Sequence, residues 1–75
     1  MDRYADLSGR SGVAAYEIGD DYIRVQFKNG SIYLYTYESA GREHIETMKE
    51  LARKGEGLSG YISRYVRNLY ARKER

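Results

Sequence analysis

The sequence predicts an α+β fold in which a three-stranded antiparallel β-meander precedes two amphipathic α-helices that pack on one face of the sheet. Three observations lead to this prediction. Residues 13–37 contain β-rich runs separated by short turns, Asn29-Gly30 joins two of these runs, and residues 42–69 carry apolar side chains at helical spacing. The chain has 75 residues, which is enough for one small domain and too few for two.

The hairpin between the second and third strands sets the predicted register. A two-residue turn at Asn29-Gly30 is a strong hairpin signal, because a type I′ turn needs positive φ at both central residues. On one face this register predicts the pairs Phe27–Ile32, Val25–Leu34 and Ile23–Thr36. On the other face it predicts the pairs Gln26–Tyr33, Arg24–Tyr35 and Tyr22–Tyr37. We therefore expect one aliphatic face under the helices and one face rich in tyrosine.

The first strand of the meander is expected at Val13–Ile18. If the following turn centres on Asp20-Asp21, alternate residues of the strand join the aliphatic face: Ile18, Tyr16 and Ala14. A three-residue loop would place Glu17 there instead, so burial favours the first register. Residues 1–12 include two glycines and two serines, and we expect a mobile arm or at most a short turn.

The first helix is predicted from Gly41 or Arg42 to about Lys54, with Ser39 as its N-cap and a stop at Gly55 and Gly57. Glu43 and Glu46 suit its N-terminal end, and Arg53 and Lys54 suit its C-terminal end.

The second helix is predicted to begin near Leu58, with Ser59 as a candidate cap. Its apolar stripe consists of Leu58, Tyr61, Ile62, Tyr65, Val66 and Leu69. We expect Tyr61 and Tyr65 to lie in the core with their hydroxyls at the rim. Residues 71–75 are expected to be a charged tail that frays, so the domain is predicted to span residues 13–70.

Composition narrows the classes of protein to consider. The chain has no cysteine, so it forms neither a disulfide nor a thiolate metal site, and a cytoplasmic location is expected. Its first residues hold no apolar run typical of a signal peptide or membrane span, so no membrane contact is expected. The net charge is only +2, but residues 61–75 carry five basic side chains against one acid. The C-terminal end is therefore basic.

No arrangement of residues points to catalysis. His44 is the only histidine, and it falls on the expected exposed side of a helix rich in glutamate. One histidine without cysteine makes neither a catalytic triad nor a metal site. We therefore expect no enzyme activity, no catalytic residues, no metal, no cofactor and no small-molecule substrate.

Tyr33, Tyr35 and Tyr37 alternate along the third strand and have three interpretations. They can simply stabilise a half-exposed sheet face through cross-strand pairs. They can form a platform that stacks nucleobases while Arg24 holds a phosphate. They can also form a surface that binds another protein or a second copy of the chain. An arrangement in which the last helix crosses this face would bury the rings, and Tyr35→Ala would then cost stability.

Arg64 and Arg67 lie one turn apart, off the apolar stripe of the last helix. They are interpreted either as part of a solvated helix face or as a pair that grips successive phosphates. With so few cations, such binding would be weak and would decrease as salt rises.

Several of these motifs occur together in one known family. A strand ends in Tyr16-Glu17, the alternating strand IRVQF follows, and NGSIYLY holds a Y-x-Y pair at Tyr33 and Tyr35. The last helix carries aromatic, basic and aliphatic positions at Tyr61, Arg64, Val66, Arg67 and Tyr70. Over residues 12–70 the chain resembles the KTSC domain, found at the C-terminus of some lysyl-tRNA synthetases and as small free-standing bacterial and phage proteins. It departs from many members in having no proline before the first helix, and its glycine segment is longer.

The resemblance implies a small α+β module of unknown biochemical function, for which RNA binding has been proposed. Two hypotheses follow. The first is a non-enzymatic module that binds RNA in preference to DNA through six residues: Arg24, Tyr33, Tyr35, Tyr37, Arg64 and Arg67. The second is a module that binds another protein or itself.

Overall fold

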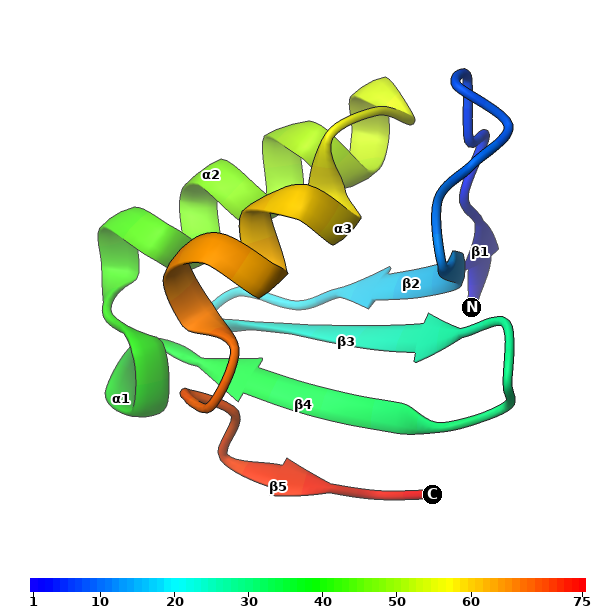
Figure 1. Ribbon diagram of the computed structural model, residues 1–75. Coiled ribbons are helices and arrows are strands. Elements are labelled where there is room, and N and C mark those ends of the chain that lie inside the picture. Colours follow the sequence, from blue (N-terminus) through cyan, green and yellow to red (C-terminus); the bar gives the residue numbers. More distant parts are fainter.

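The computed structural model describes all 75 residues and shows an α+β fold with two helical segments, residues 42–54 and 58–66, on one face of a five-stranded antiparallel sheet (Figure 1). The strands follow one another across the sheet in sequence order: β1 (Asp2–Arg3), β2 (Val13–Ile18), β3 (Tyr22–Phe27), β4 (Ile32–Thr36) and β5 (Arg72–Lys73). The predicted meander is confirmed as the centre of the sheet, and two short edge strands are additional to it. None of the helices combines the length and the apolar character that crossing a bilayer requires.

The β3–β4 hairpin does not have the predicted register, because its loop has three residues rather than two. The backbone NH of Phe27 donates to the carbonyl of Ser31 at 2.8 Å, and that of Gly30 donates to the carbonyl of Phe27 at 2.9 Å. In this loop only Gly30 has a positive φ, 93°, whereas a type I′ turn would require one at Asn29 as well. The Asn29 side chain instead accepts hydrogen bonds from the backbone NH and the hydroxyl of Ser31.

The one-residue shift moves the tyrosines of β4 to the face that the helices cover. Tyr33 pairs with Val25 and Tyr35 pairs with Ile23, so the predicted cross-strand pairs of this hairpin are wrong on both faces. Ile23 and Val25 lie in the core as predicted, both fully buried. The tyrosine row is therefore part of the covered face and does not form a separate exposed one.

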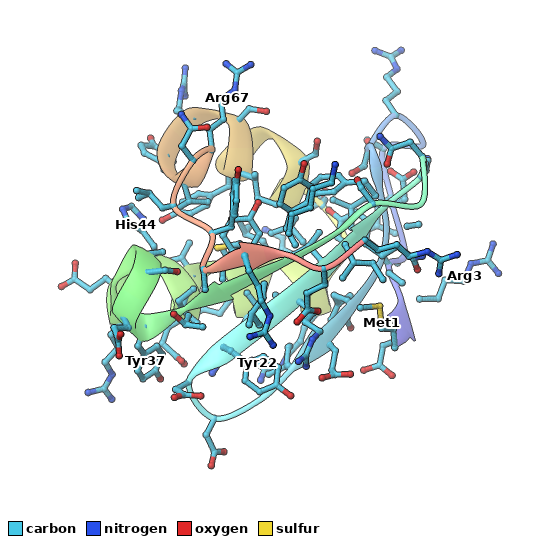
Figure 2. All side chains as sticks on the ribbon, turned by 90° about the horizontal axis from the view of Figure 1, so that it is seen from below. Met1, Arg3, Tyr22, Tyr37, His44 and Arg67 are labelled. Atoms are coloured by element: carbon cyan, nitrogen blue, oxygen red, sulfur yellow. The ribbon has the colours of Figure 1, made fainter.

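Ile32 and Leu34, which the predicted register placed in the core, lie on the uncovered face. Leu34 pairs with Arg24 on β3 and with Arg72 on β5. It is nevertheless only 8% exposed, because long arginine side chains cover apolar neighbours with their stems while the guanidinium groups stay in water. Figure 2 views the uncovered face, on which Tyr22 lies.

The β2–β3 turn has the register that burial favoured. Its cross-strand pairs are those of a turn centred on Asp20-Asp21: Ile18–Ile23, Glu17–Arg24 and Tyr16–Val25. The ladder shifts between Val13 and Ala15, so that Val13 rather than Ala14 is buried in the core. An extra residue in one strand interrupts the alternation of faces, and the sequence pattern does not reveal it.

Two helices follow β4: α1 (Tyr37–Ala40) and α2 (Arg42–Lys54). The bounds predicted for α2 are confirmed, and it ends at Gly55, whose φ of 81° is left-handed. Ser39 does not cap α2. It forms a reciprocal capping box with Thr36 that begins α1, and Tyr37 is therefore helical rather than part of the strand.

The last helical segment is shorter than predicted and changes type. It consists of α3 (Leu58–Tyr61) and a π-helix, η1 (Ile62–Val66). Leu58, Ile62 and Val66 are buried, but Tyr65 is 52% exposed, so its predicted place in the core is wrong. The wider π-helical turn changes the direction of side chains relative to a regular α-helical stripe. Ser59 does not cap α3, because Gly57 is the N-cap residue.

Both ends of the chain are more ordered than predicted. In the N-terminal arm, β1 pairs with β2, and Tyr4 is only 3% exposed within the core. At the C-terminal end, the chain returns along β4. Ala71 donates to the carbonyl of Leu34 at 2.6 Å, and Glu74 donates to the carbonyl of Ile32 at 2.7 Å. The strands β1 and β5 therefore extend the sheet, where the sequence predicted a mobile arm and a frayed tail.

Candidate nucleic-acid interface

An open groove of about 360 Å³ lies between the β3–β4 hairpin and the C-terminal helical segment. We call it the tyrosine groove; it is lined by Phe27, Asn29, Ser31, Tyr33, Tyr35, Ser59, Ile62, Ser63, Arg67, Asn68 and Tyr70. It therefore brings together three of the six residues that the sequence predicted for binding: Tyr33, Tyr35 and Arg67.

Aromatic rings in edge-to-face contact form one side of the tyrosine groove. The ring centroid of Tyr33 is 5.7 Å from that of Phe27 and 4.9 Å from that of Tyr70, and Tyr70 also contacts Tyr35. Tyr70 is 38% exposed, whereas Tyr35 is only 2% exposed. Such contacts fix the angles between rings. Tyr70 and the exposed part of Tyr33 therefore offer aromatic surface to a ligand, while Tyr35 supports them from below.

The charge of the tyrosine groove is positive. No aspartate or glutamate lines it, whereas Arg67 lines it and forms no ion pair. The ammonium group of Lys73 lies 5.8 Å from the centroid of the Tyr33 ring, and it also has no carboxylate partner. Two cations without acidic partners beside aromatic rings suit an anionic ligand with a planar group.

The environment of the Tyr35 hydroxyl disfavours its ionised form. Burial, followed by the proximity of Tyr33 and Tyr70, raises the pKa of Tyr35 to about 12. An unfolded chain would ionise this tyrosine near pH 10. Between these two values the folded state binds more protons than the unfolded state, so stability decreases as the pH rises.

We expect Tyr35→Phe to remove this part of the alkaline loss of stability. The wild-type protein should lose up to about 3 kcal/mol more than the variant as the pH rises from about 10 to about 12. Urea unfolding of both proteins from neutral pH to about pH 11.5 measures the difference. Parallel curves for the two proteins would show that the Tyr35 hydroxyl is well solvated.

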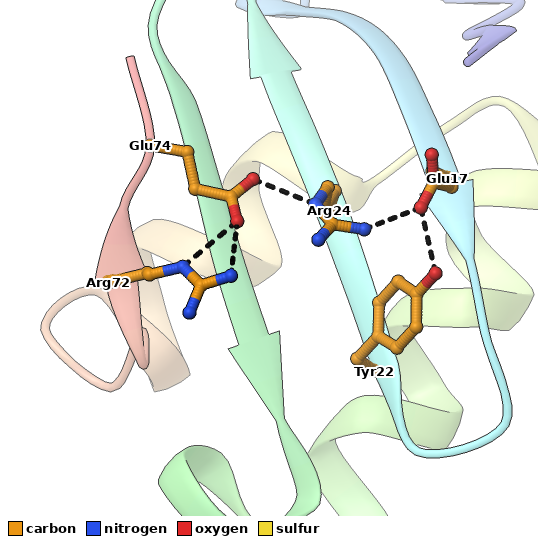
Figure 3. Close-up of polar contacts among 5 residues, drawn as sticks. All are labelled: Glu17, Tyr22, Arg24, Arg72 and Glu74. Atoms are coloured by element: carbon orange, nitrogen blue, oxygen red, sulfur yellow. Dashed lines mark hydrogen bonds and ion pairs between the residues drawn. The ribbon is translucent and has the colours of Figure 1, made fainter.

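Arg24 lies on the uncovered face, away from the tyrosine groove, and its charge is already matched. Its Nε donates to Glu74 at 2.7 Å and its Nη1 donates to Glu17 at 2.6 Å (Figure 3). The hydrogen bond to Glu74, followed by that to Glu17, raises the pKa of Arg24. Tyr22 also donates to Glu17, and Arg72 donates to Glu74. With two carboxylates on its guanidinium, Arg24 is poorly placed to hold a phosphate.

Tyr37 and Arg64 also lie outside the tyrosine groove. The Tyr37 hydroxyl donates to Glu46 at 2.6 Å, and this hydrogen bond raises the pKa of Tyr37. The same carboxylate accepts from Lys49, whose ammonium also donates to the carbonyl of Asp20. This cluster joins α1 and α2 to the β2–β3 turn. Arg64 is exposed on η1 and lines a separate hollow with Tyr65.

Sequence reasoning missed part of the groove. In the sequence Tyr70 stands out only as a motif position of the family, Lys73 only as one of the basic residues of the C-terminal end, and Asn68 not at all. Asn68 and Tyr70 line the groove because η1 ends at Val66 and the chain then turns back toward β4. β5 pairs Lys73 with Tyr33, so its ammonium group lies over the Tyr33 ring beside the groove. Residues 67–75 contain no glycine, no proline and no alternation of apolar and polar residues, so the sequence gives no indication of such a return.

The structure contains no group of three or more His, Asp or Glu side chains that could hold a metal ion. Comparison of the chain with family models, with curated proteins and with solved structures gives no match. The geometry of the groove is therefore the basis for a functional proposal.

Proposed function

We propose that the protein is a small non-enzymatic module, of the kind that the KTSC resemblance implies, and that it binds single-stranded RNA at the tyrosine groove. In this proposal one unstacked base lies against Tyr33 and Tyr70, and Arg67 contacts a phosphate. The observation that carries it is the coincidence, in one groove free of acids, of exposed tyrosine surface and an arginine without a carboxylate partner.

The size of the groove supports a ligand of the dimensions of one nucleotide. Its 360 Å³ is near the lower end of the range of roughly 300–1,000 Å³ typical of small-ligand sites. A duplex would present stacked bases whose faces cannot reach Tyr33 or Tyr70, whereas single-stranded RNA exposes them. The groove is also lined by neutral polar side chains, which suit base edges and the 2′-hydroxyl: Asn29, Ser31, Ser59, Ser63 and Asn68.

Binding at such a site depends on salt. Phosphate contacts release counterions, so affinity decreases as the salt concentration rises. With Arg67 and Lys73 as its two nearest free cations, the groove would bind weakly at about 0.15 M salt, where the Debye length is only ~8 Å.

Arg67→Ala tests the proposal. It should weaken binding of a labelled single-stranded RNA of about eight nucleotides roughly tenfold at low salt, the effect of one charge-assisted hydrogen bond. The salt dependence should also become shallower by one phosphate contact. Fluorescence anisotropy measures both quantities. Arg53→Ala is the matched control, because Arg53 is exposed, has no ion-pair partner and lines no part of the groove.

Equal losses of RNA affinity in the Arg67→Ala and Arg53→Ala variants would show that only the overall charge of the protein matters and would refute a specific site. DNA of the same sequence provides a second comparison, and equal affinity for both would remove the role of the 2′-hydroxyl. If no nucleic acid binds at low salt, the proposed function is refuted, and the tyrosine groove is instead a candidate surface for protein binding or self-association.

A further inference from the structure

A second hollow adjoins the tyrosine groove at η1. It is lined by Gly57, Gly60, Tyr61, Ser63, Arg64 and Tyr65, and it shares Ser63 with the tyrosine groove. η1 is π-helical, a type of helix that is rare and frequently found at functional sites. Val66 stays in the core while the preceding Tyr65 is 52% exposed. The sequence pattern placed Tyr65 in the core, so its exposure is a consequence of the observed backbone.

The exposed ring of Tyr65 is held in a defined orientation by two neighbours. Its centroid is 4.8 Å from that of Tyr61, and it stacks on His44 at 6.1 Å with an interplanar angle of 27°. The Tyr61 hydroxyl and Nδ1 of His44 are joined by a 2.6 Å hydrogen bond, which fixes the supporting pair. An oriented ring that is about half exposed resembles the platforms on which proteins stack single-stranded bases.

The charge of this second hollow also suits a nucleic acid. No aspartate or glutamate lines it, and Arg64 forms no ion pair. The chain has 11 acidic residues, yet neither of the two adjoining hollows has one in its lining. Arg64 lines the second hollow, and Arg67, labelled in Figure 2, lines the tyrosine groove. A polyanion that passes over Ser63 from one hollow to the other would meet both guanidinium groups.

We propose that one strand of RNA occupies both hollows, with one base at Tyr33 and Tyr70 and a second base stacked on Tyr65. This inference rests on the proposed function and extends it. Arg67 and Arg64 contact phosphates of the strand near the two bound bases, and η1 presents both groups to the strand. Occupation of both hollows therefore requires an oligonucleotide, and a mononucleotide occupies only the tyrosine groove.

Amide chemical-shift titrations with adenosine monophosphate and with an oligoadenylate of about four nucleotides test the inference. The oligoadenylate should shift the amides of Tyr33 and Tyr70 together with those of Ser63 and Tyr65, whereas the mononucleotide should shift only the first pair. Tyr65→Ala should weaken oligoadenylate binding about tenfold, as expected for one stacked base, and leave mononucleotide binding unchanged. Tyr65→Phe should bind as the wild type does, because stacking requires the ring and not the hydroxyl.

Each other outcome contradicts the inference in a recognisable way. If oligoadenylate shifts the amides of the tyrosine groove but the Tyr65→Ala variant binds it as tightly as the wild type does, the second base position is refuted and the proposed function stands. If neither ligand produces shifts at low salt, both fail. If the amides near Tyr65 shift only with protein concentration, this surface is a contact between copies of the chain, and the RNA footprint is refuted.

Discussion

Replacement of Tyr35 by alanine should lower the free energy of unfolding by about 3 to 5 kcal/mol, the range measured when buried aromatic side chains are truncated. Tyr35 is 2% exposed, pairs with Ile23 and contacts Tyr70. Its removal would leave a cavity between β4 and the C-terminal helical segment. Urea unfolding followed by far-ultraviolet circular dichroism gives the free energy directly.

Tyr65→Ala is the matched control, because it removes the same ring from a position that is 52% exposed. Its cost should stay at about 1 kcal/mol, because the ring is half exposed and loses only its contacts with Tyr61 and His44. The comparison also distinguishes the two registers of the β3–β4 hairpin. A small cost for Tyr35→Ala would indicate the register with an exposed tyrosine face, which is the one that the sequence pattern favoured.

The hairpin shows how much of the fold the sequence can predict. The residues of β2, β3 and β4 and of α2 follow from apolar periodicity and from glycines at their ends. The loop length does not follow, because Asn29-Gly30 is compatible both with a two-residue turn and with a three-residue loop closed by Gly30. This single ambiguity decides on which face Tyr33 and Tyr35 lie. Local sequence therefore predicts the strands better than it predicts the surface they present.

The candidate site, too, could be predicted from the sequence only in part. Tyr33, Tyr35 and Arg67 are brought together because the last helical segment covers the β4 face that carries both tyrosines. Arg24 shares the strand pair but points to the other face, where its neighbours Glu17 and Glu74 take up its charge. Glu74 is 50 residues from Arg24 in the sequence, and short-range patterns carry no information on such pairs.

The C-terminal segment completes the sheet and also neutralises cations on its uncovered face. β5 pairs with β4 and so covers a strand edge that would otherwise be open to pairing with other chains. Glu74 lies in this segment and pairs with both Arg24 and Arg72 on the uncovered face. These two cations are matched, whereas Arg64 and Arg67 are not, so each of the two hollows beside η1 is lined by an arginine without a carboxylate partner.

Tyr4→Ala should also cost about 3 to 5 kcal/mol, although the sequence assigned Tyr4 to a mobile arm. Tyr4 is 3% exposed in the core cluster, and its hydroxyl accepts a hydrogen bond from the backbone NH of Leu58 at 3.3 Å. It therefore joins the N-terminal strand to the first turn of α3, and truncation removes both a buried ring and the partner of a buried donor. Thermal unfolding monitored by circular dichroism should show a clear decrease in Tm.

Two further variants separate the contributions of packing and hydrogen bonding. Tyr4→Phe keeps the ring and leaves the Leu58 NH without its partner, so a loss of about 1 kcal/mol is expected. Leu7→Ala changes a residue of the same segment that is 66% exposed, and it should have almost no effect. If Tyr4→Ala were as mild as Leu7→Ala, the arm would not pack against the core, and β1 would add nothing to the stability of the sheet. A large loss in Tyr4→Ala alone would instead make residues 1–12 part of the folding unit, because a core that buries so few side chains depends on each of them.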